Sequence, residues 1–437
     1  MEVGINTGDT AWVLTSAGLV FIMTPALALF YGGMVRSKNV LTTIMQSFFI
    51  MGMVSVEFAL IGYTLAFGAD VNGLIGDLSK FGLAGVGYKI LDGTAIPELA
   101  FVAFQMMFAI LTPALITGAF AERMRFAGFA LLMLLWAVFI YNPMAHWVWG
   151  GGFLAQLGAL DFAGGLVIHI LSGVSGLTIC ILLGKRRGYG KTAMVPHNIP
   201  MTVLGAALLI WGWQGFNAGS ALGANELAAN ALVVTQAAAA AGMLGWVIPE
   251  WIRGGKPTIL GAVSGSVAGL VAITPAAGYV TILPSLAIGM IGGGICYTAV
   301  AVLKERLGYD DSLDAFGIHG IGGIWGAIAT GLWATTAVNP DGANGLFYGE
   351  SALLGAQIIS IGVAIALAVV GSTVLFKIVS LVTKIRVDEA EEITGLDVAE
   401  HGERGYNAEL FSGAPNFISG KEFAPTGTFD LNRHGAS

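Results

Sequence analysis

The chain has 437 residues, of which 56% are hydrophobic and only 11% are charged. Ordinary soluble domains hold roughly 45–50% apolar and about 25% charged residues, so the composition excludes a soluble protein and predicts one that spans a lipid bilayer many times. The formal net charge of −7 is carried mainly by the segment after Arg386, so it does not indicate a nucleic-acid partner. Cys180 and Cys296 lie in apolar runs and are expected to be small core residues, not a disulfide.

Long apolar runs follow one another along most of the chain. The first begins near residue 10 with no basic region or cleavage site before it, so we predict a retained membrane helix and not a signal peptide. Since a crossing needs about 20 apolar residues, we predict an all-α protein with eleven transmembrane helices. Their expected limits are 10–31, 41–68, 98–121, 126–145, 164–184, 199–217, 228–252, 258–274, 282–303, 315–335 and 350–380.

Basic residues separate cleanly between the two sets of connections. Of the 20 Lys and Arg residues, 18 fall in alternate connections or after the last span, and only Lys80 and Lys89 fall in the others. Basic loops stay in the cytoplasm, so we expect the N-terminus outside and the C-terminus inside, in a cell (inner) membrane. Residues 1–385 form the expected membrane domain, and 386–437 a cytoplasmic regulatory tail that is disordered after 407.

An internal repeat relates the fifth and tenth spans. Asp161 precedes His169 by eight residues, Asp311 precedes His319 by eight residues, and the two pairs are 150 residues apart. The two spans run in opposite directions, which predicts a 5+5 inverted repeat, 10–184 and 199–335, with the eleventh helix as an addition.

The two histidines are the first candidates for a functional site. At 1.5 Å per residue, each lies about 12 Å inside its own face of a core about 30 Å thick, so they are expected to meet near the midplane. Buried ionisable residues usually mark a pathway, although a single histidine is more often a packing residue. Asp311 and Asp314 are expected to be helix N-caps, whereas Asp161 either caps its helix or also stabilises a nearby positive charge.

Aromatic residues gather at the ends of other spans. Phe104 and Phe108 lie one turn apart on one face, and Trp149 and the segment from Trp213 to Ser220 lie at the same membrane edge. Such residues are often an interfacial belt, but their rings can also hold a cation. Glu57 is a carboxylate deep in a span that either lines an external vestibule or bonds locally.

These stretches together resemble the ammonium transporter family, which includes methylammonium permeases and the Rhesus proteins. The resemblance covers nine tenths of the chain, from the first helix to about Asn407. Its motifs are Phe30-Tyr-Gly-Gly33, Gly118-Ala-Phe-Ala-Glu-Arg-Met124, His146-Trp-Val-Trp-Gly-Gly-Gly152, Gly158-Ala-Leu-Asp-Phe-Ala-Gly-Gly165, Gly212-Trp-Gln-Gly-Phe-Asn-Ala-Gly-Ser220 and Phe316-Gly-Ile-His-Gly320.

The resemblance implies roles for residues along a pore. The implied substrate site for ammonium, or its analogue methylammonium, comprises Phe104, Phe108, Trp149 and Ser220. Phe108 and Phe216 form the implied stacked gate, and His169 and His319 the pore pair. Asp161 and Trp213 are the implied supporting residues.

The resemblance also implies a homotrimer and no enzymatic activity, cofactor or metal. The segment 395–407 resembles a regulatory region against which bacterial members bind PII-type signalling proteins. Met106-Met107 is bulkier than the family pattern, and 408–437 is an additional tail.

The mechanism expected from these residues is deprotonation of ammonium followed by passage of neutral ammonia, with the proton relayed by the histidines, because a bare cation is costly to desolvate. An ammonium sensor that uses the same fold is the main alternative. Paired histidines can also ligate haem in an electron-transfer subunit, but the many glycines around them argue against the porphyrin-sized gap that this requires.

Overall fold

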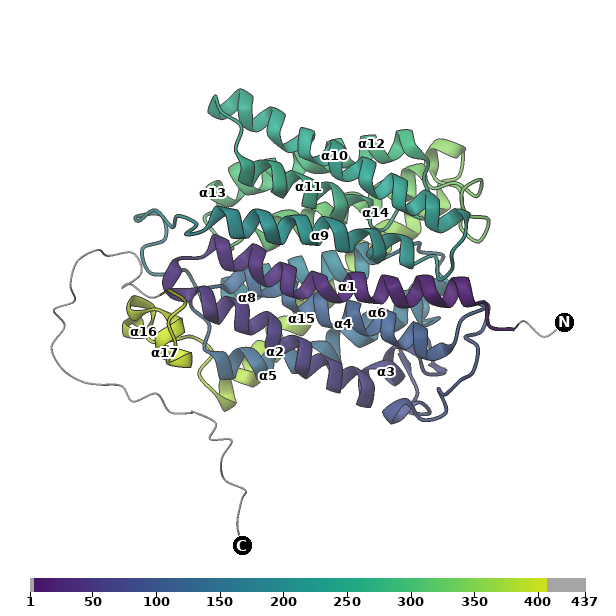
Figure 1. Ribbon diagram of the computed structural model, residues 1–437, viewed down its shortest axis with the longest axis horizontal. Helices are drawn as coiled ribbons and strands as arrows, with labels where there is room; N and C mark the ends of the chain where they lie inside the picture. Colours follow the sequence, from purple (N-terminus) through teal and green to yellow (C-terminus); the bar gives the residue numbers. More distant parts are fainter. Residues whose placement is uncertain (1–3, 407–437) are drawn as a thin grey trace, which may run out of the picture.

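The fold is a bundle of long helices, described by a computed structural model over residues 4–406 (Figure 1). The predicted disorder after 407 and the additional tail 408–437 lie outside the described residues. Within residues 4–406, nine helical segments are long and apolar enough to cross a membrane. The predicted spans 258–274 and 315–335 correspond to the shorter helix α11 and to α14 with the turn before it. The polytopic helical fold is therefore confirmed, and the count of eleven stays a prediction.

The elements follow the predicted spans closely. The first half contains α1 (Thr7–Met34), η1 (Ser37–Asn39), α2 (Val40–Glu57), η2 (Phe58–Gly62), α3 (Tyr63–Phe67), β1 (Asp70–Val71), β2 (Ile75–Gly76), η3 (Phe81–Leu83), α4 (Glu98–Phe120), α5 (Phe126–Trp136), η4 (Ala137–Tyr141), α6 (Asn142–Trp149), α7 (Phe153–Gln156), η5 (Gly165–Ile170) and α8 (Leu171–Leu183). The second half contains α9 (Ile199–Gly219), α10 (Glu226–Gly254), α11 (Ile259–Ile273), α12 (Ile282–Thr298), η6 (Ala299–Leu303), α13 (Lys304–Leu307), η7 (Phe316–Gly320), α14 (Ile321–Trp333) and η8 (Leu346–Tyr348). They are followed by α15 (Ala352–Val382), α16 (Glu389–Thr394) and α17 (Leu396–His401).

The short antiparallel ribbon β1–β2 was not predicted, and it pairs Asp70 with Gly76 in the connection between α3 and α4. Several spans also contain a π-helical turn, including η5 and η7. Periodicity does not reveal such turns, because they insert one residue without changing the apolar character of a span.

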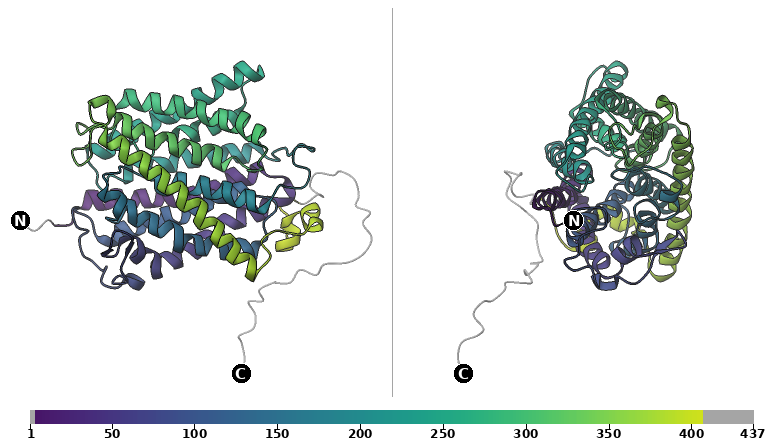
Figure 2. Two further views of the ribbon diagram at one scale, coloured as in Figure 1. Left: turned by 180° about the vertical axis from the view of Figure 1, so that it is seen from behind. Right: turned by 90° about the vertical axis from the view of Figure 1, so that its right-hand side faces the viewer.

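The predicted inverted repeat is visible in α8 and α14, whose bounds differ by 150 residues at both ends. The end of α8 lies beside Arg386, which donates a hydrogen bond to the carbonyl oxygen of Leu183. Two residues after α14, near the other end of the bundle, the amide of Thr335 donates to Tyr279 O. The helix α15 runs obliquely across the back of the bundle and contacts elements of both halves (Figure 2).

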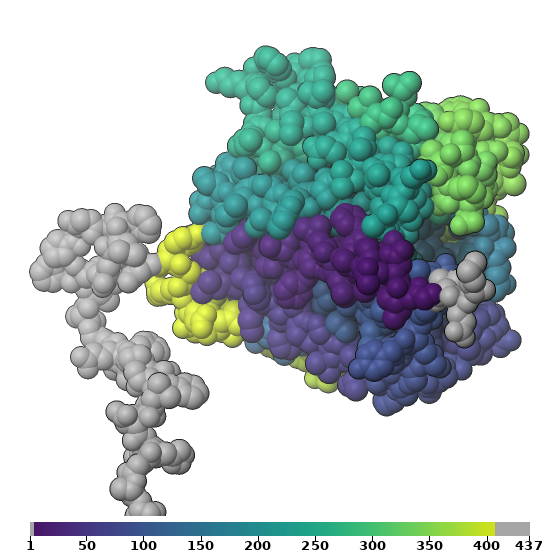
Figure 3. Space-filling view, turned by 45° about the vertical axis from the view of Figure 1, so that its right-hand side comes forward, coloured from purple at the N-terminus to yellow at the C-terminus, as the bar shows by residue number. Residues whose placement is uncertain are grey.

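The described N-terminal residues and the pair α16–α17 lie at opposite ends of the bundle (Figures 1 and 2). We call these the N-terminal end and the tail end. Opposite ends agree with an odd number of crossings. The tail segment, residues 386–406 with α16 and α17, lies against η1 and α2 (Figure 3).

Two glycines related by the repeat bring the histidine-bearing helices together. A Cβ atom built on Gly173 would lie 2.1 Å from the backbone nitrogen of Gly320, the residue after His319. A Cβ atom on Gly323 would lie 3.0 Å from both Gly165 O and His169 Cβ. Each helix therefore packs against the partner histidine's segment at a distance that only glycine allows.

Replacing Gly173 by alanine is expected to lower the thermal unfolding midpoint of the detergent-solubilised protein, because overpacking a helix contact typically costs about 1–3 kcal/mol. The effect should exceed that of Gly323→Ala, whose neighbours are less close. Gly52→Ala is the matched control: nothing lies within 4 Å of its added Cβ, so helix propensity should leave stability unchanged or raise it. A Gly173→Ala midpoint equal to the parent's would contradict the close approach.

Candidate functional site

A cavity opens at the N-terminal end of the bundle, with a volume of ≈ 390 Å³. Four predicted substrate-site residues line it: Phe104 and Phe108 on α4, Trp149 at the end of α6, and Ser220 after α9. Segments far apart in the sequence thus bring their aromatic rings to one opening. We call it the aromatic cavity.

The rings at its base form a continuous set. The centroids of Phe104 and Phe108 are 4.7 Å apart, and those of Phe108 and Trp149 are 6.2 Å apart. Phe216 is fully buried behind Phe108, at 4.6 Å with an interplanar angle of 60°. The Phe108 and Phe216 rings, which the resemblance implies form a stacked gate, are in contact with their planes inclined, and the gate itself stays a prediction.

The two predicted pore histidines meet on the buried side of the Phe108–Phe216 pair. His169 and His319 are 0% and 4% exposed, and their Nδ1 atoms are 3.2 Å apart. Their ring centroids are 5.3 Å apart, with planes inclined by only 20°. A hydrogen bond between two Nδ1 atoms needs a donor on one ring and an acceptor on the other, so the pair shares one proton.

His169 also faces Phe216 and Trp213. Its ring lies 6.0 Å from Phe216 and 5.5 Å from Trp213, nearly parallel to both. Trp213 in turn donates an indole hydrogen bond to Thr274 Oγ1 at 2.9 Å, which holds it beside the histidine. The direct contact with His319, between glycine-packed helices, leaves no gap for a porphyrin between the two imidazoles.

Asp161 organises the start of the helix that carries His169. Its carboxylate is buried and accepts hydrogen bonds from four consecutive backbone amides, those of residues 164–167, at 2.6–3.2 Å. Its carbonyl oxygen accepts the indole N–H of Trp149 at 2.8 Å. Asp161 therefore caps the helix and joins it to the aromatic cavity.

The other candidate acidic residues differ in their roles. Asp311 accepts from the amides of Ala315 and Phe316, as an N-cap should. The expected capping by Asp314 is wrong, because its side chain pairs with Lys304 and its φ is 62°. Glu57 is buried, and its Oε1 atom accepts a hydrogen bond from Asn142 Nδ2 at 2.8 Å. Glu57 is not among the residues that line the aromatic cavity.

Comparison with known proteins decides the family. The model of the Ammonium Transporter Family matches residues 11–406. The chain belongs to the ammonium transporter family. It is 56% identical to an ammonium transporter of Bacillus subtilis over 93% of this chain and 100% of that protein. It is 45% identical to the ammonium transporter Amt1 of Archaeoglobus fulgidus over 92% of this chain and 100% of that protein.

Solved structures agree with this assignment. The crystal structure of Saccharomyces cerevisiae Mep2 has a TM-score of 0.82 at 34% identity and covers 88% of each chain. A structure titled Sensor Amt Protein has a TM-score of 0.83 at 29% identity, covering 90% of this chain and 98% of that one. The matched family and the two curated relatives are ammonium transporters, not enzymes, and support ammonium transport by this chain.

Sequence reasoning missed several residues that line the transporter's aromatic cavity, among them Lys80, Asp92 and Gln105. Lys80 is neutralised by Glu98 at 2.6 Å, so its charge does not oppose a cation in the cavity. Gln105 has a buried Oε1 atom without a hydrogen-bond partner. Two features of the sequence could have indicated these residues: the long polar connection between the second and third spans, and a single side-chain amide beside Phe104.

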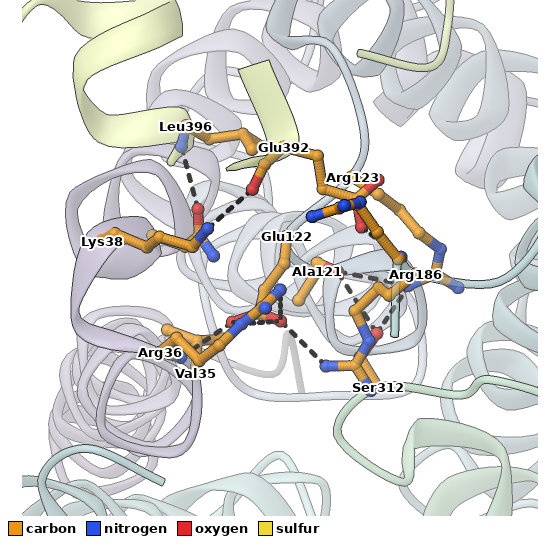
Figure 4. Close-up of polar contacts among 12 residues, drawn as sticks. Val35, Arg36, Lys38, Ala121, Glu122, Arg123, Arg186, Ser312, Glu392 and Leu396 are labelled. Carbon is orange, nitrogen blue, oxygen red and sulfur yellow. Dashed lines mark hydrogen bonds and ion pairs between the residues drawn. The ribbon is translucent and has the colours of Figure 1, made fainter. Parts of the chain in front are cut away.

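The tail end of the transporter holds an ionic cluster, comprising the partly exposed Arg36 and the buried Glu122, Arg123, Arg186 and Asp310. Glu122 accepts from Arg36 and from Arg186, although its φ of 73° is unusual for a side chain of this kind. Arg186 also pairs with Asp310 at 2.7 Å, and Arg123 donates to the carbonyl oxygen of that aspartate and to Ser312 Oγ. Figure 4 shows how Arg36, Glu122, Arg123 and Arg186 of this cluster converge from separate connections.

The tail segment binds the same end through polar contacts. Lys38 donates to Glu392 O at 2.7 Å, and Asn39 Oδ1 accepts the amide of Leu396 (Figure 4). Asp397 accepts the amides of Leu41 and Thr42 and so caps the first turn of α2. The basic residues of these connections, which the sequence predicts to lie on the cytoplasmic side, are therefore at the same end of the bundle as the tail segment.

Proposed function

We propose that this family member recruits ammonium at the aromatic cavity, removes a proton and conducts ammonia, with the proton relayed by His169 and His319. One observation carries the proposal: the aromatic cavity, the Phe108–Phe216 pair and the two histidines form an unbroken sequence of contacts. The N-terminal end is then the outer face and the tail end the cytoplasmic face of the cell (inner) membrane.

Recruitment rests on the chemistry of the cavity lining. A cation over aromatic faces gains about 0.5–2 kcal/mol, more where water is displaced, and Phe104, Phe108 and Trp149 offer such faces. The Ser220 hydroxyl donates its own proton to Phe216 O at 2.9 Å. Its oxygen lone pairs are therefore left to accept a hydrogen bond from ammonium.

Deprotonation follows from the apolar gate. Beyond Phe108 the path is buried, and a bare cation would lose its hydration there at a large cost. The imidazole pair holds one proton between its Nδ1 atoms. A second proton can therefore enter at one ring as a proton leaves the pair. Neutral ammonia crosses separately. Potassium has no proton to release, so it is excluded.

The test is the ammonium-evoked current of purified protein in liposomes on a solid-supported membrane. His169→Ala/His319→Ala protein is expected to lose current, or selectivity over potassium, by roughly 10²-fold, the usual size of a lost proton-transfer group. Gly52→Ala protein is the matched control, because nothing lies within 4 Å of the added Cβ, and it should keep the parent's current and selectivity.

Parental current and potassium exclusion in the double variant would refute the relay. Absence of current in the parent, with ammonia flux retained, would replace charge-coupled transport by electroneutral conduction.

An ammonium sensor is the second candidate, favoured by the likeness to the structure titled Sensor Amt Protein. A sensor binds the substrate at the same cavity without turnover. Methylammonium uptake into liposomes separates the two: saturable binding without uptake would indicate a sensor, and uptake a transporter. The homotrimer and a PII-type partner at segment 395–407 are further proposals, supported by the family and by the ordered polar contacts of the tail.

A further inference from the structure

A buried histidine next to the aromatic cavity has no part in the pathway described above. His146 lies on α6, three residues before Trp149, and is 0% exposed. Its Nδ1 atom is 3.0 Å from Ala66 O, and its Nε2 atom is 2.8 Å from Asp70 Oδ1. Both ring nitrogens therefore face oxygens that are 76 or more residues away in the chain.

The two partners constrain the protonation of the ring. A neutral imidazole has one donor and one acceptor nitrogen, whereas the imidazolium has two donors. The carbonyl oxygen of Ala66 can only accept, and an ionised carboxylate can only accept. Only the imidazolium satisfies both contacts at once.

Asp70 is built to keep its negative charge. Its hydrogen bond with His146 is the main cause that holds the pKa of this carboxyl below its ordinary value, and the amide of Gly73 contributes further. Its side chain is 34% exposed, so the pair is reached by protons from solution.

Glu57 also faces α6: its Oε1 atom accepts a hydrogen bond from Asn142 Nδ2, one turn before His146, whereas the ring nitrogens of His146 face Ala66 O and Asp70 Oδ1. The elements packed on α6 are α3, β2, α7, η4 and η5, and the first four contain no Asp, Glu, Lys or Arg. His169 of η5 is bonded to His319 instead. Asp77, in the same connection as Asp70, bonds to Ala69 and Ser79.

The imidazole of His146 packs closely against the backbone that follows Trp149. A Cβ atom on Gly150 would lie 2.1 Å from Ala66 O and 2.6 Å from His146 Nδ1. The amides of Gly150 and Gly152 both donate to His146 O at 3.0 Å. The next residue, Phe153, donates its amide to Gly73 O at 2.9 Å. The turn after α6 is thus clamped to the β1–β2 turn.

We propose that His146 is a positioning residue for the cavity: as an imidazolium paired with Asp70, it fixes the end of α6 and with it the indole of Trp149. Trp149 is held from the other side by Asp161 O. Losing the proton leaves either Ala66 O or Asp70 without its donor and loosens the clamp. The inference rests on the proposed recruitment of ammonium by Trp149.

The test compares KM and maximal rate for methylammonium uptake into liposomes at several external pH values. Trp149→Ala is expected to raise KM by roughly tenfold, the value of a desolvated cation–π contact. His146→Gln should raise KM by roughly three- to tenfold with a maximal rate within about twofold of the parent, since the gate and the histidine pair are untouched.

Asp70→Asn supplies the readout that a merely structural role would not move. Its amide oxygen still accepts from the ring, but the imidazolium loses its counter-charge. KM should therefore be higher in this variant than in the parent at the same external pH. This variant also replaces His146→Gln if the latter does not fold.

Each outcome decides a different statement. A parental KM in His146→Gln or in Asp70→Asn, beside a raised KM in Trp149→Ala, overturns the positioning role and leaves recruitment intact. A parental KM in Trp149→Ala refutes the recruitment site itself, and with it this inference.

Nitrogen-15 NMR of histidine-labelled parent protein should show two protonated ring nitrogens for His146 at neutral pH. The His146 signals are assigned by their loss in His146→Gln or in His146→Asn. A neutral tautomer overturns the proposal.

Discussion

Replacing Asp161 by alanine should abolish ammonium transport and lower the thermal unfolding midpoint. Four consecutive amides at the start of η5 would lose their acceptor in a buried position. A buried unsatisfied donor costs about 1–3 kcal/mol, so the turn is expected to rearrange. His169 lies two residues after the last of these amides and would lose its register with His319.

The comparison variants separate capping from charge. Asp161→Asn keeps one acceptor oxygen but places an amino group against the other two amides, so its midpoint should fall between parent and alanine. Asp311→Ala removes the acceptor for two amides and should be milder. If Asp161→Ala kept the parent's midpoint but lost current, the carboxylate would act through its charge; if both were kept, neither role would stand.

Replacing Asp310 by asparagine should give the largest loss of stability at the tail end. Asp310 is 2% exposed, and its carboxylate accepts hydrogen bonds from the backbone amide, Nε and Nη2 of Arg186. The guanidinium of Arg123 lies 4.0 Å from the same carboxylate. Removing one partner of a buried pair typically costs about 3–5 kcal/mol, because the remaining charge stays out of water. The measurement is the unfolding midpoint in detergent, with current measured on the folded fraction.

Asp388→Asn is the matched control for this loss. Asp388 pairs with Arg125 at 3.8 Å and Lys384 at 3.5 Å, but its side chain is 61% exposed, so the expected change is about 0–1 kcal/mol. Equal midpoints for Asp310→Asn and Asp388→Asn would contradict a buried, tightly coupled cluster. The double variant Asp310→Asn/Arg186→Gln should recover part of the loss.

The contribution of Asp310 to the stability of the folded protein also has a defined pH range. Burial alone would raise the pKa of Asp310, but the hydrogen bonds and charge of Arg186 hold it below its ordinary value of 3.8. A carboxyl whose folded-state pKa is lowered stabilises the protein above its unfolded-state pKa. The contribution is therefore complete at neutral pH and disappears only as pH falls through the still lower folded-state value. Asp310→Asn should lack this acid-dependent loss.

The sequence by itself determined the class of fold and the position of the histidine pair. Apolar runs near 20 residues predict membrane helices, because the backbone must satisfy its own hydrogen bonds in lipid. The 150-residue offset between Asp161–His169 and Asp311–His319 predicted that two helices of opposite direction carry equivalent residues. Helix rise then placed both imidazoles at one depth.

Only the tertiary structure decided which donor meets which acceptor. Asp311 and Asp314 are alike in sequence, yet the first caps η7 and the second pairs with Lys304. The tilt of Phe216 on Phe108, the contact of His146 with Asp70 and the ionic cluster at the tail end likewise join separate helices and connections. Local patterns encode burial and helix length, whereas these contacts depend on angles and approach distances that arise only when the helices pack.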